Sequence, residues 1–91
     1  MYRMGDLVIS IQGRDKNRLF MVMETIDDNY VLIADGSLRK TEKPKKKKIK
    51  HLEYSGKTDS EVLMKLSKNG RISNSGLRKM LLYLSDNSDK K

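Results

Sequence analysis

Alternating apolar and polar positions near the N-terminus predict a β-hairpin. In segment 5–12, the larger apolar side chains share one side of an extended chain, at Leu7, Ile9 and Ile11. Val8 is interleaved with them, and Ser10 and Gln12 fall on the other side, a period of two residues that is typical of a strand. Segment 13–17, Gly-Arg-Asp-Lys-Asn, has the composition of a turn, because Gly and Asn accept positive φ and Asp bonds its own backbone. We therefore expect a hairpin here.

The next two apolar segments predict a second and a third strand. One side of segment 18–25 is formed by Phe20, Val22 and Glu24. The other side is formed by Leu19, Met21 and Met23. Because both sides are partly apolar, this strand belongs in a barrel or in a sheet covered by another element. A turn at 26–29 and a strand at 30–35, ending at Gly36, complete an antiparallel meander.

The composition changes at residue 37, where a basic segment begins. Segment 37–48 ends in four consecutive lysines, and their ammonium groups repel one another. We therefore expect this stretch to be extended and mobile until an anion screens it. Beyond it, Ile49, His51 and Leu52 indicate a short closing strand with alternate residues facing inward. Four strands and a short tail suffice for a small, strongly bent barrel of the SH3-like type.

The C-terminal third changes to a hydrophobic period of about 3.6 residues, which predicts helices. Thr58 and Glu61 have the spacing of a capping box. One helical stripe comes next, formed by Val62, Leu63 and Leu66. Asn-Gly at 69–70 indicates a helix stop, and a second helix begins within 73–75. Its apolar face is formed by Leu77, Met80, Leu81 and Leu84.

The predicted fold is mainly β with C-terminal helices, an SH3-like small β-barrel followed by two short α-helices. We expect residues 1–56 to form the barrel, with a basic loop at 37–50. Residues 57–86 are expected to form a helical extension packed on the barrel, and 87–91 a disordered tail. A chain of 91 residues is long enough for one domain and too short for two independent cores. The barrel alone has few residues for a hydrophobic core. The favoured interpretation is therefore that the apolar faces of the helices pack on the barrel and complete its core.

The composition also limits the cellular compartments and the kinds of functional site that fit this chain. The chain has no Cys, which excludes disulfides, thiolate metal sites and Cys nucleophiles and fits a reducing compartment. Its N-terminus lacks the apolar region of a signal peptide, and no apolar stretch approaches the roughly 20 residues that span a membrane. We therefore expect a cytoplasmic protein without a membrane partner.

The positive charge points to a polyanionic partner. The net charge is +8, from 20 Lys and Arg against 12 Asp and Glu. Basic side chains that neutralise phosphates release condensed counterions, which drives binding to nucleic acids. The alternative is a basic surface that serves only solubility. The candidate RNA-binding residues lie in the first turn, the basic segment and its end: Arg14, Lys16, Asn17, Arg18, Arg39, Lys40, Lys43, Lys45, Lys46, Lys47, Lys48, Lys50 and His51.

Signals for catalysis are weak, and we expect no enzyme, no cofactor, no metal site and no small-molecule substrate. His51, the single histidine, has no neighbouring nucleophile with which to form a catalytic pair. Asp27 and Asp28 lack further acids at a metal-ligand spacing and are typical of a turn. The glycines stand singly at element boundaries and form no phosphate-binding motif.

Several of these segments together resemble the KOW motif. The matching residues are Gly5-Asp6-Leu7-Val8, the turn 13–18, Val22, Asp27 and the strand 31–36. KOW motifs occur in large-subunit ribosomal proteins of the eukaryotic and archaeal type and in small bacterial relatives. In those proteins the motif continues into a basic segment that the lysine run through Leu52 also resembles. The resemblance implies an SH3-like barrel that binds ribosomal or other structured RNA. Asn17 stands where the motif has a glycine, and Asn is the next most tolerant residue for a left-handed backbone.

Three functional hypotheses are consistent with the sequence. The leading one is an RNA-binding protein, ribosome- or rRNA-associated, that grips structured RNA through basic barrel loops and has ribosomal proteins as further partners. The second is a protein-interaction adaptor in translation or transcription that docks through its C-terminal helices, where Leu82 and Tyr83 lie beside the apolar stripe. The third is a helix-turn-helix over 58–84 that reads DNA, ranked last because its second helix offers only Arg78 and Lys79 for base contacts.

Overall fold

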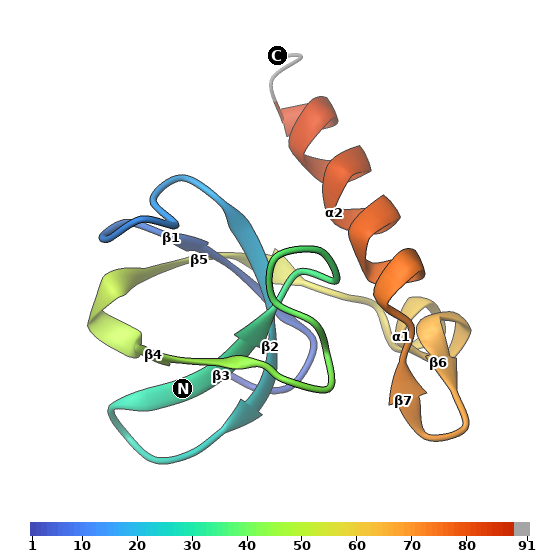
Figure 1. Cartoon of the computed structure of the whole chain (residues 1–91), viewed down its shortest axis with the longest axis horizontal. Coiled ribbons are helices and arrows are strands. Elements are labelled where there is room, and N and C mark those ends of the chain that lie inside the picture. The colour runs from blue at the N-terminus through green and yellow to red at the C-terminus, as the bar shows by residue number, and fades with distance from the viewer. Residues whose placement is uncertain (89–91) are drawn as a thin grey trace.

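The chain folds as a curved antiparallel sheet with helices beside one of its faces (Figure 1). The computed structural model describes residues 1–88. The elements are β1 (Asp6–Ser10), β2 (Leu19–Thr25), β3 (Tyr30–Ala34), β4 (Lys45–Lys48), the 3-10 helix η1 (Ile49–His51), β5 (Leu52–Lys57), α1 (Ser60–Leu66), β6 (Ser67–Lys68), β7 (Arg71–Ile72) and α2 (Asn74–Ser88). The prediction of a mainly β protein with C-terminal helices is confirmed. Of the expected tail, 87–88 fall in α2 and 89–91 lie outside the described residues.

The main sheet is strongly bent but does not close. Its five strands pair antiparallel in the order β4-β3-β2-β1-β5. The register shifts between Leu7 and Val8 against β5, and between Val22 and Glu24 against β3, and such bulges bend strands. Within residues 1–88 the edge strands β4 and β5 are not hydrogen-bonded to each other, because η1 carries the chain from one edge to the other. The closed barrel expected from the sequence is thus corrected to an open, bent sheet.

Both faces of the sheet are buried, each against a different set of side chains. One face holds a core of Val8, Phe20, Val22, Val31, Ile33 and Leu52, with Tyr2 and Ile49 packed against it. The other face packs on β7 and α2 through Leu7, Met21, Ala34, Ile72, Leu77 and Leu81. The expected alternation in β2 is therefore confirmed, since its two sides enter the two cores.

In β1 the burial differs from the alternating pattern. Ile11, expected beside the core, is 38% exposed, whereas Ser10 is fully buried on the side expected to be polar. Burial of Ser10 is tolerated because its hydroxyl donates to the carbonyl of Gln12 at 3.0 Å. Near its end, β1 is therefore buried on the side of Val8 and Ser10 rather than on the side of Ile11, which an alternating pattern alone does not reveal.

The turn between β1 and β2 has the left-handed backbone that the sequence indicated. Asn17 has φ 72° and Gly13 has φ 87°. The amide of Asn17 donates to the carbonyl of Ser10 at 2.7 Å, which closes the turn onto β1. Asn17 therefore supplies the conformation for which the KOW motif uses glycine.

The lysine run is extended, as expected, but it is a paired strand of the sheet and not part of a mobile loop. β4 pairs with β3 in the register Tyr30↔Lys48, Val31↔Lys47, Leu32↔Lys46 and Ile33↔Lys45. Alternate side chains of a strand point to opposite faces, so neighbouring ammonium groups separate instead of crowding one loop. The predicted closing strand at 49–52 is likewise corrected, because Ile49–His51 form η1 and Leu52 begins β5.

The segment before β4 is also fixed, by contacts with the start of α2. The amide of Thr41 donates to Asn74 Oδ1 at 2.8 Å, and its hydroxyl donates to the carbonyl of Ile72 at 2.9 Å. Asn74 Nδ2 donates in turn to Glu42 Oε1 at 2.7 Å. At Gly36, a Cβ would approach the Asn74 carbonyl oxygen to 2.2 Å, so only glycine permits this packing.

In the C-terminal third, α2 begins within 73–75 as predicted, but the cap of α1 and the connection between the helices differ from the prediction. The N-cap of α1 is Asp59, and the buried Thr58 hydroxyl has no hydrogen-bond partner among the described residues, so the predicted capping box does not form. Residues 69–70 end no helix but turn the β6–β7 hairpin, with positive φ at both positions. This hairpin separates α1 from α2, and α2 buries Leu77 and Leu81 against the sheet. A helix-turn-helix is therefore not present in the described chain.

Candidate nucleic-acid interface

The structure brings the first basic turn and the lysine strand together. Lys45 Nζ donates to Asp15 Oδ2 at 2.8 Å, and Lys47 Nζ donates to the carbonyl of Gln12 at 3.0 Å. Both contacts join β4 to the β1–β2 turn across at least thirty positions of sequence. The turn and η1 lie at the end of the sheet that is remote from α1 and the β6–β7 hairpin (Figure 1). Two basic segments thus meet at one end of the molecule.

Asp15 is the anionic centre of this junction. Its side chain is 10% exposed and pairs with Lys45. The hydrogen bond from Lys45 holds the pKa of Asp15 below its usual range, against the opposing effect of burial, and the charges of Lys45, Arg39 and Lys47 lower it further. The carboxylate is therefore ionised near neutral pH and neutralises cations that would otherwise repel one another.

Lys45 and Lys47 lie on the face of β4 that adjoins the core. Their partners in register, Ile33 and Val31, belong to the core cluster with Phe20. Lys47 is only 8% exposed, so its aliphatic stem is buried while its ammonium group reaches the turn. These two lysines are among the residues expected to bind RNA, and each ammonium group has a hydrogen-bond partner within the chain.

The remaining cations at this end are exposed. They come from the turn, from the opposite face of β4 and from η1, and we call them the basic edge: Arg14, Lys16, Lys46, Lys48 and Lys50. Lys46 Nζ lies 4.5 Å from the centre of the Tyr30 ring, a cation–π contact that holds it beside β3. The basic edge therefore presents positive charge whose counterions an RNA phosphate could replace.

Of the other candidate residues, His51 lies beside the basic edge, whereas Lys40 and Lys43 flank Thr41, which bonds to Asn74 and Ile72 on the helical side of the sheet. Arg39 is half-buried, and Lys40 and Lys43 are exposed in the segment between β3 and β4. His51, in η1, has its pKa lowered by burial and by the neighbouring charges of Lys50, Lys47 and Lys48. It is therefore mainly neutral near pH 7, when its ring can both donate and accept a hydrogen bond.

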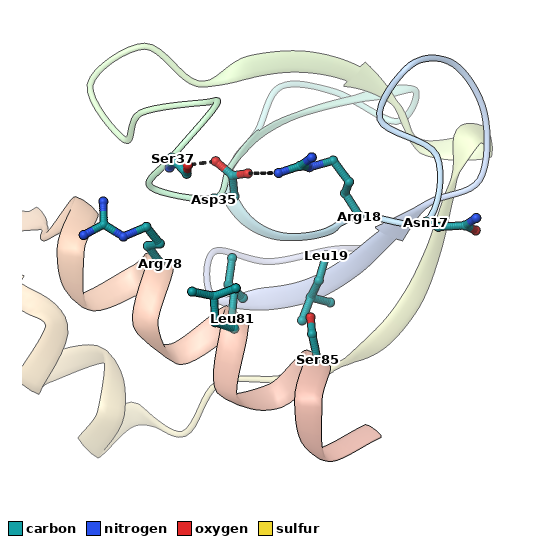
Figure 2. A pocket seen from close by; sticks show the side chains of 9 residues that line it. Asn17, Arg18, Leu19, Asp35, Ser37, Arg78, Leu81 and Ser85 are labelled. Carbon is teal, nitrogen blue, oxygen red and sulfur yellow. Dashed lines mark hydrogen bonds and ion pairs between the residues drawn. The ribbon is translucent and has the colours of Figure 1, made fainter. Parts of the chain in front are cut away.

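Arg18 faces a different surface, a groove between the sheet and α2. This groove has a volume of about 310 Å³, and Figure 2 shows Arg18 directed to Asp35, with Arg78 extending from α2. Arg18 and Asp35 are 3.9 Å apart, a long ion pair in which Arg18 stays 47% exposed. Arg78 is exposed here and was not among the expected RNA-binding residues. The hydrophobic period of a helix does not reveal which part of the sheet the helix will pack against.

Two further expectations concern metals and membranes. Asp27 behaves as a turn residue, since its Oδ1 accepts the amides of Asn29 at 2.8 Å and of Tyr30 at 2.9 Å. Within residues 1–88, His, Asp and Glu side chains form no group of three that could hold a metal ion. No helix in the same residues is long and apolar enough to cross a membrane.

Comparison with known proteins identifies a relative. No model of a protein family matches the chain. The large ribosomal subunit protein eL14 of Desulfurococcus amylolyticus is 32% identical over 74 residues, which cover 72% of this chain and 77% of that protein. This similarity confirms the resemblance to KOW-bearing large-subunit ribosomal proteins that the strand and turn residues indicated. The chain belongs to the eL14 family of large ribosomal subunit proteins.

Proposed function

We propose that the chain is an RNA-binding protein of the large ribosomal subunit that grips structured RNA through its basic edge. The observation that carries this proposal is the junction of the β1–β2 turn with β4, in which Lys45 and Lys47 are held internally. This arrangement leaves the cations of the basic edge exposed on a rigid support. The eL14 relative supports the ribosome as the place of binding, and hence the cytoplasm as the compartment and other ribosomal proteins as partners.

The form of recognition is set by the side chains at this edge. Lysine ammonium groups are point charges that bind phosphate, and they carry no information on base identity. Backbone charge and RNA shape are therefore the expected determinants of binding. The bent sheet, the left-handed Asn17 and the glycine turns support an SH3-like KOW module open between its edge strands. The eL14 relative also supports a role that does not involve catalysis.

A salt series tests the proposal. The full chain would be titrated by fluorescence anisotropy against an RNA hairpin, a single-stranded RNA and a DNA duplex of equal length. We expect the hairpin RNA to bind most tightly, with a preference that persists at physiological salt. Equal and steeply salt-dependent binding to all three would contradict recognition of structured RNA and would reduce the basic edge to a general polyanion site.

An adaptor role is a second candidate because α2 leaves apolar side chains exposed. Leu82 is 58% and Tyr83 67% exposed, although Leu77 and Leu81 on the same helix are buried. The test is cosedimentation with isolated large ribosomal subunits at a salt concentration that suppresses phosphate contacts. Loss of cosedimentation in the double variant Leu82→Ser, Tyr83→Ser would support protein docking, and unchanged cosedimentation would reject it.

A further inference from the structure

A hollow lies between the β2–β3 turn and the junction of β4 with η1. It has a volume of about 410 Å³ and is lined by Asp28, Asn29, Tyr30, Lys48, Ile49 and Lys50. Its two walls are tied together, because the amide of Ile49 donates to the carbonyl of Asn29 at 2.8 Å. The turn is fixed by Asp27, whose carboxylate accepts the amides of Asn29 and Tyr30. The hollow is therefore preformed rather than created by side-chain motion.

An aromatic ring and several cations meet at this hollow. Tyr30 is half-buried and pairs in register with Lys48, which is exposed. Lys46 lies 4.5 Å from the centre of the Tyr30 ring, and Lys50 lines the hollow from η1. The ring offers an apolar surface for stacking, Lys46 holds a cation near its centre, and Lys48 and Lys50 line the hollow with the ring.

We propose that this hollow binds an unpaired nucleotide of the RNA, with its base packed against the Tyr30 ring and its phosphates at Lys48 and Lys50. The inference rests on the proposed function and names a feature that the bound RNA would carry, a bulged or looped-out base. Single-stranded bases are recognised in proteins by stacking on aromatic rings beside cationic side chains. A regular duplex keeps its bases stacked internally and could use only the lysines.

The acidic side of the hollow orients the nucleotide. Asp28 lies on the β2–β3 turn, across from Lys48 and Lys50 on β4 and η1. A carboxylate repels phosphate, so the phosphates belong on the lysine side. The same carboxylate can accept a hydrogen bond from an amino group on the edge of a base. An acidic peptide would place negative charge beside Asp28 and leave Tyr30 unused, so a nucleotide fits the lining better.

The test uses two RNA hairpins that differ only in one bulged 2-aminopurine. We expect the full chain to bind the bulged hairpin about 10-fold more tightly than the paired one, as stacking of one base on an aromatic ring allows. Binding should also change the fluorescence of the bulged base. Tyr30→Leu should remove both effects and leave the salt dependence intact. The matched control is Tyr83→Leu, which deletes a 67% exposed ring on α2 and should retain both effects.

Contrary outcomes separate this inference from the proposed function. Binding of both hairpins with equal affinity and no fluorescence change would reject the nucleotide site and leave RNA binding by the basic edge standing. Binding of neither hairpin would reject both proposals. If Tyr30→Leu does not fold, the unmodified protein can be crosslinked to a hairpin with 4-thiouridine at the bulge. Crosslinks mapped within 28–30 or 48–50 would support the site, and crosslinks confined to other segments would overturn it.

Discussion

Lys45 and Lys47 lie on one face of β4, and Lys46 and Lys48 lie on the other. The same residue type therefore occurs in two different environments on one strand. The inner lysines donate hydrogen bonds to Asp15 and to the Gln12 carbonyl and join the strand to the first turn. The outer lysines are exposed, one over the Tyr30 ring and one at the rim of a hollow. The environment of each lysine is thus set by the group that its ammonium contacts and not by its neighbours in sequence.

This difference assigns separate tasks to the two faces. An ammonium group with a short internal hydrogen bond would have to leave its partner to bind phosphate, whereas an exposed one exchanges only water and counterions. We therefore expect the inner face to contribute to folding and the outer face to be the one that contacts RNA in the proposed function. Substitutions on the two faces should affect different measurements.

The largest effect is expected from the outer face. Replacing Lys46, Lys48 and Lys50 by Ser should remove up to three phosphate contacts and lower the slope of log affinity against log salt by about 2.7 for a duplex. At physiological salt this corresponds to roughly 100-fold weaker binding, measured by fluorescence anisotropy. The control is Lys65, Lys68 and Lys79 replaced by Ser, which removes the same charge from the helical side. Equal losses in both variants would show that net charge, and not the basic edge, determines binding.

Substitutions on the inner face of β4 should change the free energy of unfolding. Lys45→Met keeps the aliphatic stem but leaves the Asp15 carboxylate without its hydrogen-bond donor, which should lower the free energy of unfolding by about 2 kcal/mol. Lys48→Met makes the same change on the outer face and should alter stability by less than about 0.5 kcal/mol. Denaturant unfolding measures both. Indistinguishable stabilities would contradict the division of β4 into two faces.

The Asp15 contact also predicts a pH dependence. Because the pKa of Asp15 is lower in the folded state than its unfolded value of about 3.9, the carboxylate stabilises the fold above that pH. The contribution is lost as the pH falls through the folded pKa. The stability difference between the unmodified protein and Asp15→Asn should therefore shrink below about pH 4, in unfolding curves measured across pH. A difference that is constant with pH would show that the ion pair contributes nothing.

The smallest effect concerns His51. Burial and the charges of the surrounding lysines lower its pKa, so its ring should titrate below about 6.5 in a nuclear magnetic resonance titration. RNA phosphates at the basic edge would offset those lysine charges and raise the pKa in the complex. A pKa that is unchanged by RNA would place the phosphates away from η1.

Much of the sheet could be predicted from sequence because its signals are local. Both sides of β2 were assigned correctly, since Phe20 and Val22 alternate with Leu19 and Met21. The apolar series on α2 was also found, because its period is contained within the helix itself. The left-handed conformation of Asn17 was predictable from residue type and position in a turn.

The parts that were missed depend on partners far away in sequence. From the sequence alone, four consecutive lysines are expected to repel one another. In the structure, two of them bind Asp15 and the carbonyl of Gln12, which lie about thirty residues earlier in the chain. The capping box failed because Thr58 is drawn back toward β1, where its amide donates to the Gly5 carbonyl at 3.0 Å. The β6–β7 hairpin did have a local signal, since Asn-Gly is the preferred two-residue hairpin turn.

For the candidate site, the sequence singled out basic segments that the structure brings to one end of the molecule, but it did not reveal the contacts of each cation. It grouped Lys45 to Lys48 together, although strand alternation divides them between the two faces. It also gave no indication that Arg78 would line the same groove as Arg18, because that arrangement depends on how α2 packs against the sheet. Placement of the exposed charges therefore required the three-dimensional structure.

The most direct measurement is a titration of the isotope-labelled full chain with an RNA hairpin, monitored by amide chemical shifts. If the basic edge grips RNA, the shifts should be largest in residues 13–18 and 45–51 and should weaken as salt is raised. Amides around Lys79 and Tyr83 on the exposed side of α2 should change little. Shifts concentrated on α2, with the β1–β2 turn and β4 unaffected, would contradict RNA binding through the basic edge.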